Sequence, residues 1–158
     1  MRVPKIYLET SVFNFYFADD APDKRQDTLK LFEEIKAGLY VPYTSAYVLQ
    51  ELIRAEEPKQ SQMVSLIGEY EMRFLEQSGI IRILAGQYVS EGIIPAKHLT
   101  DALHIATATV NDLDVIVSFN FQHIVKRKTV TMTEVVNLRE GYKRIGIFSP
   151  TEVIESGE

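Results

Sequence analysis

The sequence predicts an α/β protein, built as a three-layer α/β/α sandwich with a central, mostly parallel sheet. Short β-prone runs alternate with segments of helical periodicity along the chain, which is typical of this architecture. Residues 115–117 form an unbroken β-branched run, as a parallel strand covered on both faces requires. Residues 101–110 are apolar or small on nearly all sides, which indicates a helix buried inside the protein.

A single domain over residues 1–158 accounts for the length and composition of the chain. No repeat or Pro/Gly/Ser-rich linker divides the sequence. Hydrophobic residues at 46% and charged residues at 25% match globular averages and exclude a disordered or fibrous chain. The amino terminus lacks the apolar core of a signal peptide, and no run of ~18 apolar residues occurs. We therefore expect a cytoplasmic protein that makes no contact with a membrane.

Charge and residue usage restrict the ligands. With 22 acidic and 17 basic residues the formal net charge is −5, so binding of a nucleic acid requires a local basic patch. The absence of cysteine and the wide spacing of the three histidines argue against a zinc site, whereas hard-metal chemistry on oxygen ligands stays open. Six basic residues crowd the last quarter of the chain, as an RNA contact or as the solvated face of a terminal helix. They are Lys126, Arg127, Lys128, Arg139, Lys143 and Arg144.

The first elements follow from apolar runs and turn residues. Residues 5–8 form a short β-prone run that stops at the polar residues after it. Residues 19–27, which include a proline, indicate a loop. In residues 26–37 the apolar positions recur at helical spacing, and Gly38 is placed to end this helix. Residues 39–42 are the next strand candidate.

The middle of the chain predicts two helices and a strand. Thr44 or Ser45 can cap a helix that ends near Pro58. Apolar side chains in residues 63–75 share one helical face, so a second helix is expected there. Residues 80–84, Ile-Ile-Arg-Ile-Leu, predict a strand.

The remaining elements lead to the expected site. Residues 87–95 predict a short helix or a loop, Thr100 is placed to cap the helix over residues 101–110, and the strand over residues 115–117 follows. In an open parallel sheet, ligands bind beyond the carboxyl ends of the strands. The polar residues that come after each strand are therefore the candidates for function.

Four polar residues stand out. Glu9 follows the first strand and Asn120 follows the last buried strand. No glycine occurs before Gly38, so the Gly-rich turn of a nucleotide site is missing. Asp101 opens an apolar helix, where a carboxylate must be paired, coordinated to a metal or stabilised by its own helix dipole. Glu51 lies on a helix, either as a ligand or as an ordinary solvated residue.

Four segments carry a recognisable set of motifs. Residues 6–12, Ile-Tyr-Leu-Glu-Thr-Ser-Val, join a strand to an acidic-Thr-Ser signature, and residues 48–52, Val-Leu-Gln-Glu-Leu, place a glutamate on a helix. Residues 101–108 read Asp-Ala-Leu-His-Ile-Ala-Thr-Ala, and residues 115–124 carry Asn-Phe-Gln-His after a strand. In this order, and with the closing residues 147–154, the set resembles the PIN domain, the small α/β/α nuclease fold of the VapC-type toxins.

The resemblance implies a site and an activity. Glu9, Glu51 and Asp101 are expected to converge at the end of the sheet and hold Mg²⁺ or Mn²⁺, with Asn120 completing the catalytic set. No organic cofactor is implied. The implied activity is a metal-dependent endoribonuclease that hydrolyses RNA phosphodiesters. The implied setting is the toxin of a toxin–antitoxin pair, with RNA as substrate, an antitoxin protein as inhibitor and a homodimer as the assembly.

Two residues depart from the usual acidic set of the family, and alternatives stay open. Glu9 reaches one methylene further than the usual aspartate, and Asn120 is neutral, so we expect weaker metal binding or turnover. One alternative is a catalytically weak or silent PIN fold that binds RNA or protein through its basic segment. The other is a structural acidic cluster paired with Lys or Arg. His123 is expected to be a packing residue, and Thr10 and Ser11 are expected to satisfy backbone amides.

Overall fold

The computed structural model describes residues 2–154, in which five strands form one sheet: β1 (Lys5–Leu8), β2 (Val41–Ser45), β3 (Arg73–Leu75), β4 (Val115–Val117) and β5 (Gly146–Phe148). Their order across the sheet is β3-β2-β1-β4-β5, and every neighbouring pair is parallel. The register places Tyr7 of the central strand opposite Tyr43 on one side and Ile116 on the other. The predicted α/β class with a parallel sheet is confirmed.

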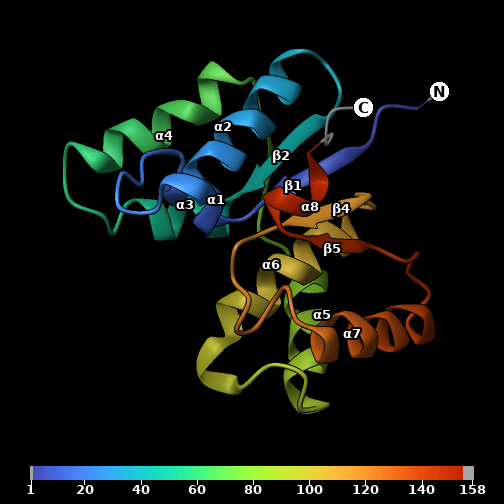
Figure 1. Cartoon of the computed structure of the whole chain (residues 1–158). Helices are drawn as coiled ribbons and strands as arrows, with labels where there is room; N and C mark the ends of the chain where they lie inside the picture. The colour runs from blue at the N-terminus through green and yellow to red at the C-terminus, as the bar shows by residue number, and fades with distance from the viewer. Residues whose placement is uncertain (1, 155–158) are drawn as a thin grey trace.

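Helices cover both faces of the sheet. They are α1 (Thr10–Tyr16), α2 (Pro22–Lys36), α3 (Ala46–Leu52), α4 (Lys59–Glu69), α5 (Gly79–Ser90), the 3-10 turn η1 (Ala96–His98), α6 (Leu99–Val110), α7 (Arg127–Arg139) and α8 (Pro150–Val153). Figure 1 shows α1 to α4 on one face and α5, α6 and α7 on the other, which gives the three predicted layers. Among residues 2–154, no helix is both long and apolar enough to cross a membrane.

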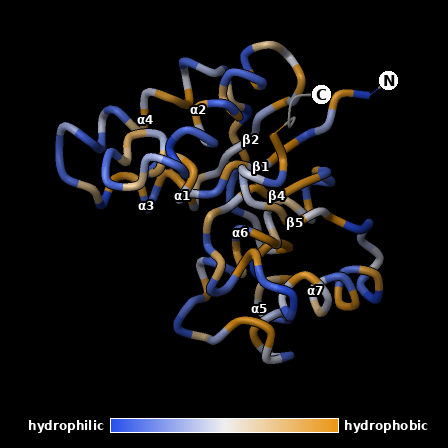
Figure 2. The backbone as a smooth tube through the Cα atoms, viewed as in Figure 1, coloured by the Kyte–Doolittle hydropathy of each residue, from blue (hydrophilic) through white to orange (hydrophobic). Residues whose placement is uncertain are grey.

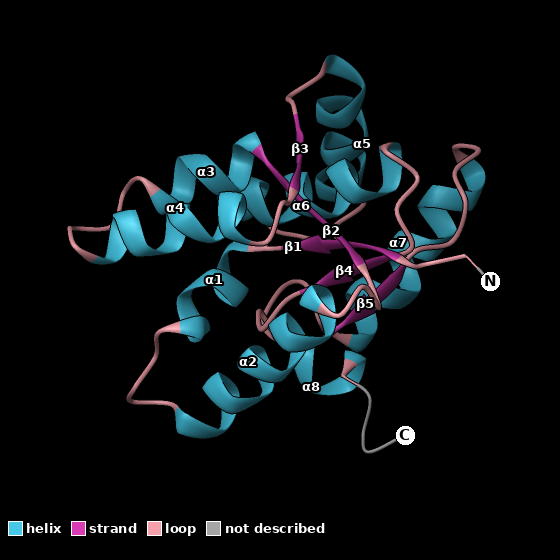
Figure 3. Ribbon diagram, turned by 90° about the horizontal axis from the view of Figure 1, so that it is seen from above, coloured by secondary structure: helices cyan, strands magenta, loops and turns pink. Residues whose placement is uncertain are grey.

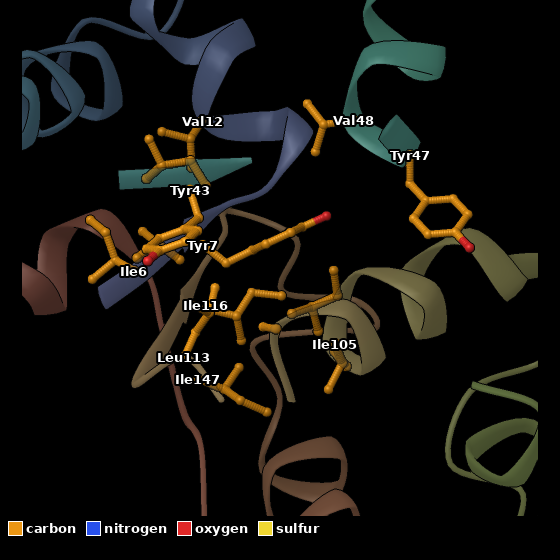
Figure 4. Packing of buried hydrophobic residues seen from close by; sticks show 14 of the residues in the cluster. Ile6, Tyr7, Val12, Tyr43, Tyr47, Val48, Ile105, Leu113, Ile116 and Ile147 are labelled. Carbon is orange, nitrogen blue, oxygen red and sulfur yellow. The ribbon is translucent and has the colours of Figure 1, made fainter. Parts of the chain in front are cut away.

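The central strand lies in the middle of the core. The side chains of Ile6, Tyr7 and Leu8 are inaccessible to solvent. Val48 of α3 and Ile105 of α6 pack in the same cluster from opposite layers, and the hydroxyl of Tyr7 points toward the space between these two helices (Figure 4). The outer helices α4 and α7 alternate hydrophobic and hydrophilic residues along their length (Figure 2), because only one face of each contacts the core.

Several elements agree with the sequence. The strands expected over residues 5–8 and 115–117 are β1 and β4, and the apolar helix over residues 101–110 is contained in α6. Gly38 follows α2 with a φ of 85°, the left-handed conformation that ends a helix. Ser45 caps α3, since its Oγ accepts the backbone N–H of Val48 at 3.3 Å.

The first half of the chain contains more helix than the sequence indicates. α1 lies where a loop was expected. The sequence does not indicate this helix, because its N-cap residue Glu9 makes no capping bond and its aromatic residues are weak helix formers. α2 begins at Pro22 rather than at residue 26, since proline suits the first turn of a helix. β2 begins at Val41 rather than at residue 39, and α3 already ends at Leu52.

The helix expected over residues 63–75 is wrong at its carboxyl end. α4 stops at Glu69, and Glu71 has a φ of 52°, which turns the chain out of the helix. Phe74 and Leu75 belong to β3. They happen to lie at helical spacing from Met63. Apolar periodicity alone does not distinguish a helix followed by a strand from one longer helix.

The strand expected over residues 80–84 is also wrong, because this segment belongs to α5. Ile81, Leu84 and Tyr88 are buried at helical spacing, whereas Ile80 and Ile83 are 58% and 67% exposed. A short apolar run does not distinguish a strand from a helix that is partly hydrophobic on its outer face.

The start of α6 differs from its prediction. Residues 87–95 contain the last turn of α5 and the turn that follows it. α6 begins at Leu99 with His98 at the N-cap, so Thr100 lies inside the helix and is not its cap. Asp101 therefore lies in the first helical turn. The sequence does not mark this start, because histidine is not among the preferred capping residues and His98 makes no side-chain capping bond.

Candidate functional site

Glu9 is held at the end of the central strand. Its backbone N–H donates to the carbonyl oxygen of Val117 on β4 at 3.1 Å, and the residue is only 5% exposed. The hydroxyls of Ser11 and Ser118 both donate to Oε1 of its carboxylate, each at 2.6 Å. Both hydroxyls use Oε1, and neither of them contacts the second carboxylate oxygen of Glu9, which lines the cavity described below.

Glu51 reaches the same edge of the sheet from α3. Its Oε1 accepts hydrogen bonds from Thr10 Oγ1 and from Nε2 of His104, the latter at 2.7 Å. His104 lies on α6 and is fully buried. Its Nδ1 lies 2.7 Å from the hydroxyl of Tyr7, which in turn lies 2.7 Å from Ser45 Oγ. A chain of polar groups therefore runs from the core to Glu51.

The contact between Glu51 and His104 favours a charged pair. Burial raises the pKa of Glu51, but the hydrogen bond and positive charge of His104 outweigh it and lower this pKa below its usual value. Burial in turn lowers the pKa of His104, but the hydrogen bond that its ring donates to Glu51 and the negative charges of Glu9, Glu51 and Asp101 raise it above its usual value. Glu51 is therefore held as a carboxylate.

Asp101 enters the site from the first turn of α6. Burial raises the pKa of its carboxyl group, while the charges of His104 and His123 and a hydrogen bond from the Asn120 side chain act in the opposite direction. The carbonyl Oδ1 of Asn120 accepts the backbone N–H of His123 at 3.0 Å. The amide of Asn120 is thus oriented with its N–H₂ group toward Asp101.

An open cavity of about 510 Å³ brings the four predicted site residues together. Glu9, Glu51, Asp101 and Asn120 all line it, and the exposed side chain of Arg54 lines it as well. Figure 3 shows α1 and α3 leaving the sheet at the same edge, where β1 and β2 end. This edge is the place where a parallel sheet is expected to bind ligands.

Within this region the candidate metal ligands form two tight groups. In the part of the chain that the structure describes, donor atoms of Glu9, Glu51 and His104 lie within 4.8 Å of one another. A second group, with the same limit of 4.8 Å, consists of His98, Asp101 and His123. Asp101 therefore lines the cavity from the side of the second group.

The acidic residues have no partner of the kind that a purely structural cluster requires. Within residues 2–154, no lysine or arginine forms an ion pair with Glu9, Glu51 or Asp101. The ion pair that the described residues do form here joins the imidazole of His104 to Glu51. The structure does not support the alternative of a cluster paired with Lys or Arg.

His104 is the main site residue that sequence reasoning missed. It lies three positions after Asp101 on a helix that is otherwise apolar or small, and that isolated polar ring was the available signal. The hydroxyls of Thr10 and Ser11 were expected to serve backbone amides. Ser11 does accept the N–H of Phe119 at 2.8 Å, but both hydroxyls also donate to the carboxylates of the site.

The predicted basic patch divides into two halves. Arg139, Lys143 and Arg144 each lie within 3.3 Å of a carboxylate oxygen, so their charges are neutralised inside the chain. Residues 126–128 are exposed and form no ion pair with any described residue. Only this second half is free to bind an anion.

Comparison with known proteins identifies a family and solved structures of similar fold. A family model described as PIN domain matches residues 6–128, a range that contains all four predicted site residues. No curated protein matches the sequence. The fold is similar to the crystal structure of VapBC2 from Rickettsia felis bound to a DNA fragment from their promoter, with a TM-score of 0.57 and 14% sequence identity. The alignment covers 92% of this chain and 98% of that one.

Proposed function

The chain belongs to the PIN domain family, and from this premise we propose that it is a divalent-metal-dependent endoribonuclease and the toxin of a toxin–antitoxin pair. One observation supports the proposal above all others. The carboxylates of Glu9, Glu51 and Asp101 line one open cavity at the carboxyl edge of the sheet, and no described lysine or arginine forms an ion pair with them.

The chemistry of these donors fits Mg²⁺ or Mn²⁺. Carboxylate oxygens are the hard ligands that both ions prefer, and an RNA phosphate supplies further oxygens. Glu9, Glu51 and Asp101 would hold the ion. Bound there, the ion would polarise the phosphoryl oxygens and lower the pKa of a water molecule.

The remaining side chains of the site hold the three carboxylates in place. Ser11 and Ser118 fix the carboxylate of Glu9, and Thr10 and His104 fix that of Glu51. The amide of Asn120 does the same for Asp101 through its hydrogen bond. We assign to Asn120 this positioning role, because its own oxygen is used by the backbone N–H of His123.

Charge balance is consistent with one tightly held ion. Three carboxylates carry −3, and a protonated His104 adds +1, so the group carries −2 when that imidazole is charged. One divalent cation neutralises this charge, and a second ion would need the negative charge of an RNA phosphate. Arg54, exposed at the cavity, provides a positive charge for that phosphate.

Cleavage of an unstructured RNA in Mn²⁺ tests this function. We expect the wild-type chain to cleave it and Glu51→Gln to bind it without cleaving. Arg139→Ala is a matched control, since that residue is ion-paired away from the cavity. Absence of cleavage by the wild type at saturating Mn²⁺ would overturn the ribonuclease assignment.

An antitoxin and a second copy of the chain complete the proposal. The similar fold of VapBC2 from Rickettsia felis supports a protein partner of this kind. A small protein encoded next to this chain, with a DNA-binding pattern, should co-purify with it and block RNA cleavage. Light scattering of the isolated chain should give the mass of a homodimer.

A binding module without turnover is the second candidate. It is favoured by the glutamate at position 9, in the place where the family usually has aspartate, and by the use of the Asn120 oxygen away from the cavity. This alternative predicts that RNA is retained, with and without Mn²⁺, and stays intact. Retention depends in this case on the exposed basic residues 126–128.

A further inference from the structure

Two histidines that are distant in sequence meet beside Asp101. His98 closes the turn η1 and is the N-cap residue of α6, whereas His123 lies in the loop after β4. Their ring centroids are 4.0 Å apart and the ring planes are tilted by 30°. The donor atoms of His98, Asp101 and His123 all lie within 4.8 Å of one another.

The backbone on both sides of this group is fixed, while the imidazole rings are free to bind. The N–H of His123 donates to Asn120 Oδ1 at 3.0 Å, and its carbonyl oxygen accepts from Thr129 Oγ1 at 2.8 Å. The N–H of His98 donates to the carbonyl oxygen of Pro95 at 2.9 Å. Neither ring has a hydrogen-bond partner among residues 2–154, and both side chains are half-buried, so solvent reaches them.

The geometry suits a small ion with nitrogen and oxygen ligands. Zn²⁺ binds imidazole nitrogen and carboxylate oxygen at about 2.0–2.2 Å in a tetrahedron, which places neighbouring donor atoms roughly 3.3 Å apart. Donor atoms that already lie within 4.8 Å reach this spacing by small side-chain rotations. His98 and Asp101 are three residues apart at the start of one helix, so they face the same side.

We propose that His98, Asp101 and His123 form a site for a divalent transition-metal ion of the Zn²⁺ class, separate from the acidic cavity and joined to it only through Asp101. Two imidazoles with one carboxylate select Zn²⁺, Co²⁺ or Ni²⁺ over Mg²⁺, which prefers oxygen ligands. Three protein ligands leave a fourth position for water or for a ligand from solution.

The shared carboxylate couples the two sites. An ion at the histidines draws the charge of Asp101 away from the acidic cavity, so each ion weakens the binding of the other. If the ribonuclease proposal holds, Zn²⁺ inhibits cleavage supported by Mn²⁺. The predicted inhibition rests on the proposed function. The predicted binding of Zn²⁺ to the histidine site does not rest on it.

Metal titration of the full chain, stripped with a chelator and free of RNA, tests the site. Co²⁺ should give a visible ligand-field spectrum with nitrogen ligands, and Zn²⁺ should displace it with a stoichiometry of one ion per chain. His98→Ala and His123→Ala should each weaken Zn²⁺ binding at least ~10-fold, because even mutations of residues that only contact a metal ligand cause a loss of this size. Circular dichroism shows whether each variant is folded.

Two controls separate this site from the acidic cavity. Gln122→Ala alters the exposed neighbour of His123 and should leave Zn²⁺ binding unchanged. Glu51→Gln removes a ligand from the cavity but none from the histidine group, so it should change Zn²⁺ binding far less than either histidine variant. Equal Zn²⁺ affinity in the wild type and both histidine variants, no Zn²⁺ binding by the wild type, or a loss confined to Glu51→Gln would each overturn the proposal. A chain that does not cleave RNA still gives a clear answer here.

Discussion

Nε2 of His104 lies 2.7 Å from Oε1 of Glu51, and this contact joins the buried core to the acidic cavity. His104 is inaccessible to solvent, and its other ring nitrogen contacts the hydroxyl of Tyr7 on the central strand. The imidazole therefore fixes the position of Glu51 relative to the sheet. It also keeps Glu51 ionised, since its hydrogen bond and charge more than offset the effect of burial on the pKa of that carboxyl group.

Removing His104 should destabilise the fold. His104→Ala leaves Glu51 without its cation and the Tyr7 hydroxyl without one of its partners, and it leaves a space in the core. We expect a loss of about 3 kcal/mol in the free energy of unfolding, measured by urea denaturation. His104→Gln, which keeps a donor but no charge, should lose less. A double-mutant cycle with Glu51→Gln should give a coupling energy of at least ~1 kcal/mol. Additive effects would show that the pair contributes nothing.

Asp114 offers a prediction for the pH dependence of stability. Arg2 donates two hydrogen bonds to its carboxylate, each at 2.8 Å, and the backbone N–H of Lys5 and the ammonium of Lys143 add two more. These contacts, the Arg2 guanidinium first, hold the pKa of Asp114 well below its usual range. A lowered folded-state pKa means that the stabilisation is complete above the unfolded value, about 3.9, and is lost as the pH falls through the folded value.

Asp114→Asn should therefore be less stable than the wild type by about 1 kcal/mol in neutral solution. The difference should stay constant down to about pH 5 and shrink below about pH 4, because the carboxylate then becomes protonated in the unfolded state while it is still ionised in the folded state. Thermal unfolding across this range measures it. Asp20→Asn is a suitable control, because its exposed carboxylate lies in a turn and forms no ion pair with a described residue. A difference that persists unchanged in acid would point to packing rather than charge.

Metal binding at the cavity should depend on Asp101. Mn²⁺ and Mg²⁺ should raise the melting temperature of the wild type, because a cation relieves the repulsion that Glu51 exerts on Asp101. Asp101→Asn should remove most of this rise. Asp112→Asn is the matched control, since Asp112 is exposed, lies outside the cavity and already has the left-handed conformation that asparagine tolerates. Identical Mg²⁺ titrations for the wild type and Asp101→Asn would contradict the assignment.

RNA binding should depend on Lys126, Arg127 and Lys128. These residues are exposed and unpaired in the described chain, so replacing all three by alanine should weaken RNA binding. The slope of log K against log salt concentration should become less steep by up to ~2. Thermal shift in Mn²⁺ should stay as in the wild type. The comparison variant replaces the three ion-paired residues Arg139, Lys143 and Arg144, and it should change the salt dependence much less. Equal effects of the two variants would mean that net charge alone governs binding.

The order of motifs predicted which residues share one edge of the sheet better than periodicity predicted the helices and strands. Glu9 and Asn120 were located correctly because a residue that follows a parallel strand must lie at the carboxyl edge of the sheet, whatever its side chain does. The segment at residues 80–84 was misassigned because Ile80 and Ile83 are apolar yet exposed, so the buried face of α5 is masked. His104 and the pairing of His98 with His123 depend on contacts between distant segments, which no local pattern contains.

Glu9 is the residue at which sequence and structure lead to different expectations. Its extra methylene relative to aspartate suggested that Glu9 supports metal binding but poor turnover. In the structure, the hydroxyls of Ser11 and Ser118 meet its Oε1 from two segments, one after β1 and one after β4, at 2.6 Å each. The two serine hydroxyls lie at hydrogen-bond distance from the carboxylate of a glutamate, which indicates that the site is built for the longer side chain.

Glu9→Asp should accordingly slow RNA cleavage rather than restore it. The shorter side chain withdraws the carboxylate by about 1.5 Å, so it cannot keep both serine contacts and face the cavity. Because a misplacement of that size typically costs up to ~100-fold in rate, we expect a loss of 10- to 100-fold in single-turnover cleavage with Mn²⁺ and RNA saturating. Glu9→Gln should abolish cleavage, and Ser118→Ala should reduce it less than Glu9→Asp, since Ser11 still holds the carboxylate. Faster cleavage by Glu9→Asp would show that the two serines hold Glu9 away from the productive position.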